Sequence, residues 1–165
     1  ERHNLITVRK GVSRGTRASR AANEIPVYGK VAAGMPIESG GYVMKTVSIP
    51  SGLFRKQPDY LLQVDGDSMV DELIFEGDLV AVKRSQIADP GEIVVAQVLT
   101  EEMSKAEMIR NGISSNGITL KKISVHLGQF RLKSCNRARN YAPFVLNPDR
   151  VKIEGTFLGV VRAVP

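Results

Sequence analysis

Short apolar runs with a two-residue period dominate the chain from Ile25 onward, and turn-forming residues separate them at regular intervals. Runs of β-branched and aromatic residues bounded by Gly, Pro, Asn and Asp are typical of strands. We therefore expect a mainly β domain over residues 25–165. The expected strands are Val27–Ala33, Val43–Ile49, Tyr60–Val64, Leu79–Lys83, Ile93–Leu99, Ile118–Val125, Phe130–Leu132, Val151–Ile153 and Phe157–Val164.

Helical periodicity is scarce. We expect helical turns at Ser51–Arg55 and Met69–Ile74, and either a short helix or an extended hairpin tip within residues 100–116. Residues 11–24 are rich in Gly, Ser, Arg and Ala and lack apolar periodicity, which predicts a linker. The chain therefore divides into residues 1–24 and a β domain of residues 25–165.

Composition narrows the class of protein. With 165 residues, of which 42% are hydrophobic and 24% charged, the chain suits one soluble domain with a tail. Apolar runs such as Ile93–Ala96 are far shorter than the ~20 residues of a membrane span. Cys135 is the single cysteine, which excludes an internal disulfide and suits a reducing cytoplasm. With His3 and His126 distant from it, we expect no metal site and no cofactor.

The positive charge is concentrated at the start of the chain. Residues 1–22 carry six basic residues against Glu1, which accounts for +5 of the net charge of +6. Such a tail neutralises phosphates when it lies near DNA. A solvated linker has the same composition, and both interpretations remain open.

Lys121 interrupts an apolar strand face. Alternation along Ile118–Leu127 separates two faces, of which the more apolar should lie inside. Burial would lower the pKa of Lys121 from about 10.4 and supply a neutral amine as a general base. Alternatively, Lys121 lies near the strand end and reaches water. The inner face holds Thr119, Lys121, Ile123, Val125 and Leu127, and the outer face holds Lys122, Ser124 and His126.

Ser68 lies in the turn Asp65–Met69, directly after the apolar run Tyr60–Val64. A serine hydroxyl attacks a carbonyl only when a base takes its proton and donors stabilise the oxyanion. A serine at a strand end can present outward-facing amides, and the backbone N–H groups of Asp67 and Ser68 are the candidates. The competing interpretation is a simple polar turn. The two histidines have no partner pattern, which disfavours a Ser-His-Asp triad.

Three motifs resemble the LexA family of self-cleaving SOS repressors, which also includes phage repressors and UmuD polymerase subunits. They are Val31-Ala32-Ala33-Gly34, Asp65-Gly66-Asp67-Ser68-Met69 and Thr119-Leu120-Lys121-Lys122. The resemblance implies the β fold shared with signal peptidases, with Ser68 as nucleophile, Lys121 as base and the Ala33–Gly34 bond as substrate. Because residues 100–116 are longer than expected for the family, Lys122 is an alternative base, and strand alternation selects Lys121.

The resemblance also implies partners: a homodimer through the final strands, a RecA filament on single-stranded DNA as co-protease, and operator DNA. DNA binding would use an N-terminal domain that is mostly absent from this chain, with Leu5–Val8 as its last strand. Two alternatives remain: a UmuD-like polymerase accessory protein, and a non-catalytic β module whose basic tail contacts nucleic acid. A signal peptidase would need a membrane segment, and we expect no membrane partner.

Overall fold

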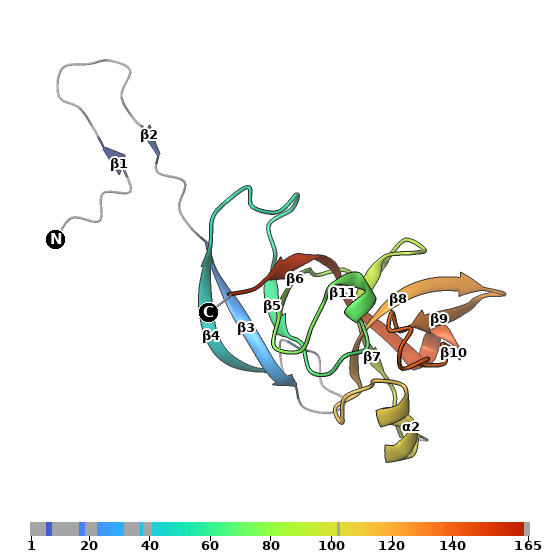
Figure 1. Cartoon of the computed structure of the whole chain (residues 1–165). Coiled ribbons are helices and arrows are strands. Elements are labelled where there is room, and N and C mark those ends of the chain that lie inside the picture. The colour runs from blue at the N-terminus through green and yellow to red at the C-terminus, as the bar shows by residue number, and fades with distance from the viewer. Residues whose placement is uncertain are drawn as a thin grey trace.

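The computed structural model describes residues 6–7, 17–18, 23–31, 37, 41–101 and 103–163. Within these residues, nine strands form one sheet in the order β10-β9-β8-β7-β11-β6-β5-β3-β4 (Figure 1). A separate pair joins β1 (Ile6–Thr7) to β2 (Arg17–Ala18). The sheet strands are β3 (Asn23–Val31), β4 (Gly41–Ile49), β5 (Tyr60–Gln63), β6 (Leu79–Lys83), β7 (Ile93–Val98), β8 (Ile118–His126), β9 (Gln129–Lys133), β10 (Phe144–Leu146) and β11 (Val151–Val161).

The mainly β class predicted from the sequence is confirmed, with several differences in the strands. Strand β2 lies within residues 11–24, which were expected to be a linker, and β3 begins at Asn23 instead of Val27. The short strand β10 was not expected, and β11 is one continuous strand where two were expected. Gly155, between the two expected strands, lies at an irregularity where β11 stays paired. A Cβ at Gly155 would lie 2.4 Å from Val82 Cγ1, so glycine serves close packing against β6.

Strand β11 lies inside the sheet and changes its pairing partner along its length. Residues 151–156 pair with β7, and residues 156–161 pair with β6. The dimer expectation treated the final strands as an uncovered edge. Instead, the side chains of Phe157 and Val160 pack against the central core, and each half of β11 is bonded to a neighbouring strand.

The helical expectations have mixed outcomes. Residues 51–55 form turns and bends, so the helical turn expected there is wrong: Leu53 N bonds Pro50 O, and the positive φ of Gly52 prevents a helix. The second expected turn is the 3-10 helix η1 (Val70–Glu72). Residues 100–116 contain the helix α2 (Lys105–Arg110), which Ser104 begins with a capping box. A further 3-10 helix, η2 (Pro148–Arg150), precedes β11.

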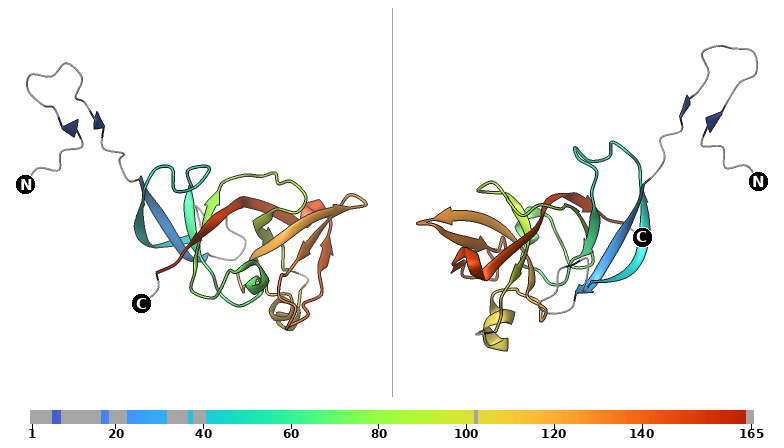
Figure 2. Two further views of the ribbon diagram at one scale, coloured as in Figure 1. Left: turned by 45° about the horizontal axis from the view of Figure 1, so that its top comes forward. Right: turned by 180° about the vertical axis from the view of Figure 1, so that it is seen from behind.

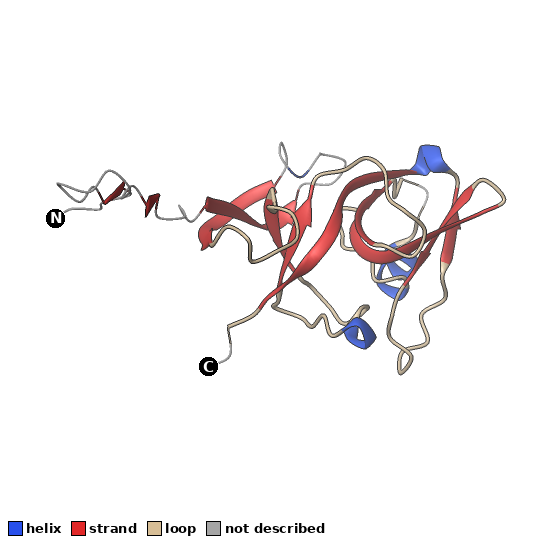
Figure 3. Cartoon of the chain, turned by 90° about the horizontal axis from the view of Figure 1, so that it is seen from above, coloured by secondary structure: helices blue, strands red, loops and turns tan. Residues whose placement is uncertain are grey.

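The strands curve instead of lying flat (Figure 3). One core cluster includes Tyr60, Met69, Val80 and Val82, and a second includes Val94, Ala96, Ile123 and Leu132. Burial of this apolar surface is the main stabilising term for such a sheet. The Met69 side chain is 2% exposed, and its burial anchors the turn after β5 to the core.

The inner face predicted for β8 holds only for its first half. Thr119, Lys121 and Ile123 are buried, whereas Val125 and Leu127 are 52% and 87% exposed. Figure 2 shows the reason, since the β8–β9 pair extends away from the body of the domain. Alternation assigns a residue to one face of a strand, but it does not show where that face is no longer packed against the rest of the domain.

Candidate active site

Ser68 and Lys121 are brought together from distant parts of the chain. Ser68 follows β5 in the turn that leads into η1, and Lys121 lies within β8. The Lys121 Nζ atom lies 2.9 Å from the Ser68 Oγ atom, which is hydrogen-bonding distance. The two strands are not neighbours in the sheet, so the curvature of the sheet creates this contact.

The Lys121 side chain is fully buried. Burial lowers its pKa from the usual value near 10.5 to about 7, while the nearby Cys135 thiol acts weakly in the opposite direction. Near neutral pH the amine is therefore available without a proton. An amine in that state can accept one from a neighbouring hydroxyl.

Two backbone carbonyls complete the surroundings of this amine. Lys121 Nζ lies 3.0 Å from Gly112 O and 3.2 Å from Leu120 O. Carbonyl oxygens only accept hydrogen bonds, and a neutral amine has two N–H groups and one lone pair. When both N–H groups donate to the carbonyls, the lone pair faces the Ser68 hydroxyl.

Gly112 is a site residue that sequence reasoning missed. It follows α2 with a φ of +60°, and a Cβ there would lie 3.1 Å from Ser68 Cβ and 3.2 Å from Lys121 Nζ. Thr119 Oγ1 also donates to Gly112 O, at 2.8 Å. The available sequence signal was Asn111-Gly112 at the end of a helical segment, which indicates a helix terminus. That pattern says nothing about a contact with Ser68.

Lys122 points away from the Ser68–Lys121 pair. Its Nζ atom lies 2.7 Å from Glu72 Oε1, and its side chain is 39% exposed. The Glu72 carboxylate raises the pKa of Lys122, and Lys122 in turn lowers the pKa of Glu72. Of the two candidate bases, only Lys121 contacts Ser68 in the structure.

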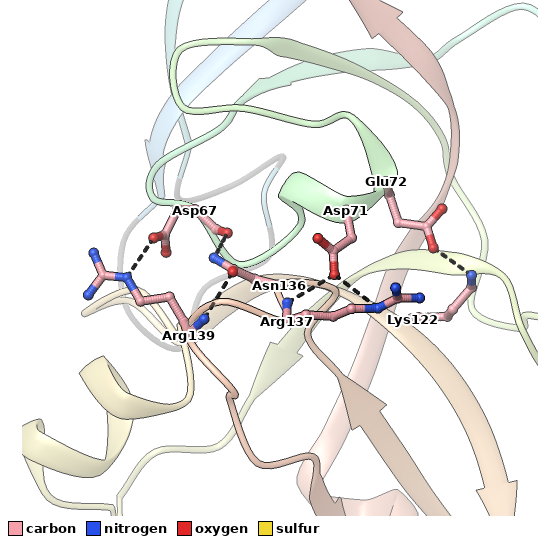
Figure 4. A network of polar contacts seen from close by, with 7 residues as sticks. All are labelled: Asp67, Asp71, Glu72, Lys122, Asn136, Arg137 and Arg139. Carbon is pink, nitrogen blue, oxygen red and sulfur yellow. Dashed lines mark hydrogen bonds and ion pairs between the residues drawn. The ribbon is translucent and has the colours of Figure 1, made fainter.

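Residues 134–139 hold the turn that carries Ser68 (Figure 4). Cys135 N donates to Ser68 O at 2.7 Å, and Asn136 Nδ2 donates to Asp67 O at 2.7 Å. In a trans peptide the N–H points opposite to the carbonyl. Asn136, which is 6% exposed, therefore fixes the direction of the Ser68 N–H, one of the two oxyanion donors expected from the sequence.

The other expected donor, the Asp67 N–H, has a different environment. It lies against the carboxylate of its own residue, which also binds Tyr141 OH at 2.7 Å and Arg139 Nε at 3.0 Å. The Tyr141 hydroxyl, together with Arg139, holds the pKa of Asp67 below its usual value. The basic residues after β9 thus bind the acidic turn beside Ser68.

A hollow of about 390 Å³ opens between α2 and the segment after β9. Two of its residues also bind the Asp67 carboxylate, so the hollow adjoins the Ser68 turn. Its lining comprises Ile109, Arg110, Arg139, Asn140, Tyr141 and Ala142.

The expected cleavage bond, Ala33–Gly34, lies outside the described residues. The structure describes the chain on either side of it: β3 ends at Val31, and Ile37 is buried. Ile37 belongs to the same core cluster as Met69, the residue after Ser68. Three residues after Gly34, the chain therefore enters the core cluster that also contains Met69.

Over the described ranges, no group of three or more His, Cys, Asp or Glu residues is placed to hold a metal ion. In the same part of the chain, every helix is too short or too polar to cross a membrane. Most of the basic tail expected to contact DNA lies outside the description.

Comparison with known proteins gives consistent matches. Residues 26–158 match the Peptidase S24-like family. The chain is 40% identical to the LexA repressor of Alcanivorax borkumensis, over 98% of this chain and 72% of that protein. It is 38% identical to LexA repressor 1 of Xanthomonas oryzae pv. oryzae, over 96% and 73%. It is 39% identical to LexA repressor 2 of Pseudomonas putida, over 84% of this chain and 60% of that protein.

Proposed function

Since this chain belongs to the Peptidase S24-like family, together with the LexA repressors, we propose that it represses the SOS response to DNA damage and ends repression by cutting itself. The cut bond is Ala33–Gly34, the nucleophile is Ser68 and the base is Lys121. The contact of 2.9 Å between Lys121 Nζ and Ser68 Oγ is the observation that carries the proposal.

The reaction begins with neutral Lys121. Its amine takes the Ser68 proton as Oγ attacks the carbonyl carbon of Ala33, and the Ser68 N–H donates to the oxyanion. The Asp67 N–H is the second donor, and to reach the oxyanion it must leave the carboxylate of its own residue. The C–N bond to Gly34 then breaks, and the Lys121 ammonium gives its proton to the leaving amine. An ester joins Ala33 to Ser68.

Water completes the cycle. Lys121, neutral again, takes a proton from a water molecule that attacks the ester carbonyl. The ester bond breaks, Ser68 Oγ regains a proton from Lys121, and Ala33 becomes a new C-terminal carboxylate. Small residues at Ala33 and Gly34 suit a bond that must enter a narrow site.

Cleavage ends repression by separating two functions. Residues 1–24 would form the end of a DNA-binding domain and its linker, and residues 25–165 the peptidase and dimerisation domain. Two DNA-binding domains held together in a homodimer, each on one half of the operator, bind that DNA much more tightly than two separate domains do. A RecA filament on single-stranded DNA is the proposed co-protease, and its role rests on the family alone.

The test is direct. The purified chain is incubated at mildly alkaline pH, with and without a RecA filament, and fragment masses are measured. We expect a new C-terminus at Ala33 and a new N-terminus at Gly34, with no cleavage in Ser68→Ala. A wild-type chain that stays intact over days with the filament present would contradict the proposal.

Cleavage should occur within one molecule, because the bond and the two catalytic residues share a chain and react at a high effective concentration. The fractional rate should then be the same at low and high protein concentration. A rate that rises in proportion to concentration would mean cleavage between molecules.

A further inference from the structure

Residues 100–116, the α2 segment, connect β7 to β8 and reach the Ser68–Lys121 pair. Among its described residues, the segment contributes no ionisable side chain to this contact. What it contributes is the backbone of Gly112, whose carbonyl lies 3.0 Å from Lys121 Nζ.

The position of Gly112 is fixed from both sides. Before it, α2 ends, with Gly112 N bonded to Ile109 O at 3.1 Å. After it, Ile113 is 4% exposed and packs in the second core cluster, which anchors the segment to the sheet. Thr119 lies two residues before Lys121, on the same face of β8, and its hydroxyl donates to the Gly112 carbonyl at 2.8 Å.

A side chain at Gly112 would crowd the Ser68–Lys121 pair. Its φ of +60° is a conformation that other residues adopt at a cost, and a Cβ would lie 3.2 Å from Lys121 Nζ. The missing side chain allows the backbone to lie against both reacting groups. This close approach is part of what excludes water from Lys121, whose side chain is fully buried.

We propose that the α2 segment positions the base. The Gly112 carbonyl directs the Lys121 amine toward Ser68, and the close approach of Gly112 excludes water from that amine. This inference rests on the proposed function, since it assigns a role in the same reaction. Gly112 positions the base and takes no part in proton transfer.

The charged groups around Lys121 do not supply this role. Among the described residues, Cys135 is the group whose charge would act on Lys121, and as a thiolate it would raise the pKa of the lysine. Burial raises the pKa of the Cys135 thiol itself, which favours its uncharged form. The nearby carboxylates are paired elsewhere, Glu72 with Lys122 and Asp67 with Arg139. The uncharged backbone of Gly112 is therefore the group that orients the amine and excludes water from it.

The test compares Gly112→Ala with Gly128→Ala. Both glycines have positive φ, but a Cβ at Gly128 would meet no atom within 4 Å. The two substitutions therefore impose a similar backbone cost, and only Gly112→Ala disturbs the pair. We expect self-cleavage to fall about tenfold to a hundredfold in Gly112→Ala and to stay unchanged in Gly128→Ala.

A second readout is independent of cleavage. In the full chain carrying Ser68→Ala, NMR of the lysine Cε carbons measures the pKa of Lys121 directly. We expect Gly112→Ala to raise this pKa by about one unit or more, toward the solvent value near 10.4. Thr119→Val, which removes a donor to Gly112 O without adding bulk, should raise it by less.

The outcomes separate the two proposals. If Gly112→Ala cleaves like Gly128→Ala and leaves the pKa of Lys121 unchanged, the positioning role is wrong while the peptidase can stand. If the wild-type chain does not cleave but Gly112→Ala raises the pKa of Lys121, the proposed function fails and the role of Gly112 in holding the amine stands. Should Gly112→Ala not fold, the Thr119→Val titration decides.

Discussion

The amine of Lys121 lies 2.9 Å from the hydroxyl of Ser68, although the two residues are 53 positions apart in the chain. Three different segments maintain this contact. Strand β8 carries the lysine, the turn after β5 carries the serine, and Gly112 lies against both. A buried amine with a lowered pKa beside a hydroxyl is the arrangement that a serine nucleophile and a lysine base would need in the proposed reaction.

Substitutions at the two adjacent lysines should have opposite consequences. Lys122→Ala breaks a half-exposed ion pair with Glu72 and should change the cleavage rate by less than about threefold, because such pairs contribute little. Lys121→Ala should abolish cleavage. Fragment yields of the two variants after equal incubation provide the measurement. If Lys122→Ala stops cleavage while Lys121→Ala does not, the assignment of the base is wrong.

Lys121 should destabilise the fold at neutral pH. Its pKa is about 7 in the folded chain and near 10.5 when exposed, so the unfolded chain binds more protons between these values. Stability should therefore rise with pH across that window, and the full cost should be present at pH 7 and below. In a Ser68→Ala background, Lys121→Met should raise the free energy of unfolding at pH 7 by roughly 2–4 kcal/mol.

Urea unfolding at several pH values measures this effect. The gain from Lys121→Met should shrink as the pH approaches 10, because removing the proton from the lysine costs less free energy as the pH nears its unfolded-state pKa of about 10.5. A gain that is absent at pH 7, or the same at pH 7 and 10, would show that the lysine is not desolvated as the structure indicates.

Asn136 should affect the oxyanion donors and not the base. Asn136→Ala removes the hydrogen bond that fixes the Asp67 carbonyl, and with it the direction of the Ser68 N–H. We expect the maximal cleavage rate to fall about tenfold to a hundredfold, with an unchanged apparent pKa in the pH–rate profile. Gln129→Ala, which removes an exposed amide hydrogen bond to Asn147, is the matched control and should cleave normally. An Asn136→Ala chain that cleaves at the parental rate would refute this role.

We expect a homodimer that uses the C-terminal half of β11. Residues 157–161 pair with β6, and their side chains remain only half-buried in the single chain. Sedimentation at tens of micromolar protein should show a dimer, and Phe157→Glu should shift it toward monomer. A protein that stays monomeric at those concentrations would contradict the predicted homodimer.

Strand positions and the inward face of Lys121 could be predicted from the sequence, since both follow from local alternation. Strand β6 has the expected bounds, and Lys121 is buried as its register requires. The limits of that reasoning appear at Leu127, which the same alternation places inside although the β8–β9 pair has left the body of the domain.

The support around the site could not be predicted, because it consists of contacts between distant segments. Gly112 and Asn136 act through a backbone carbonyl and a single amide, and neither carries a pattern that marks it as functional. The partner of the basic residues after β9, the Asp67 carboxylate, appears only when the chain is folded.

The pH dependence of self-cleavage tests the central claim most directly, because only neutral Lys121 can act as the base. With its pKa at about 7, the wild-type rate should rise tenfold per pH unit below that value and level off above it. Lys121→Arg should be inactive at every pH, since arginine keeps its proton. A wild-type rate that does not change with pH would contradict the lysine-base mechanism, and a rate still rising tenfold per unit at pH 10 would contradict the buried amine.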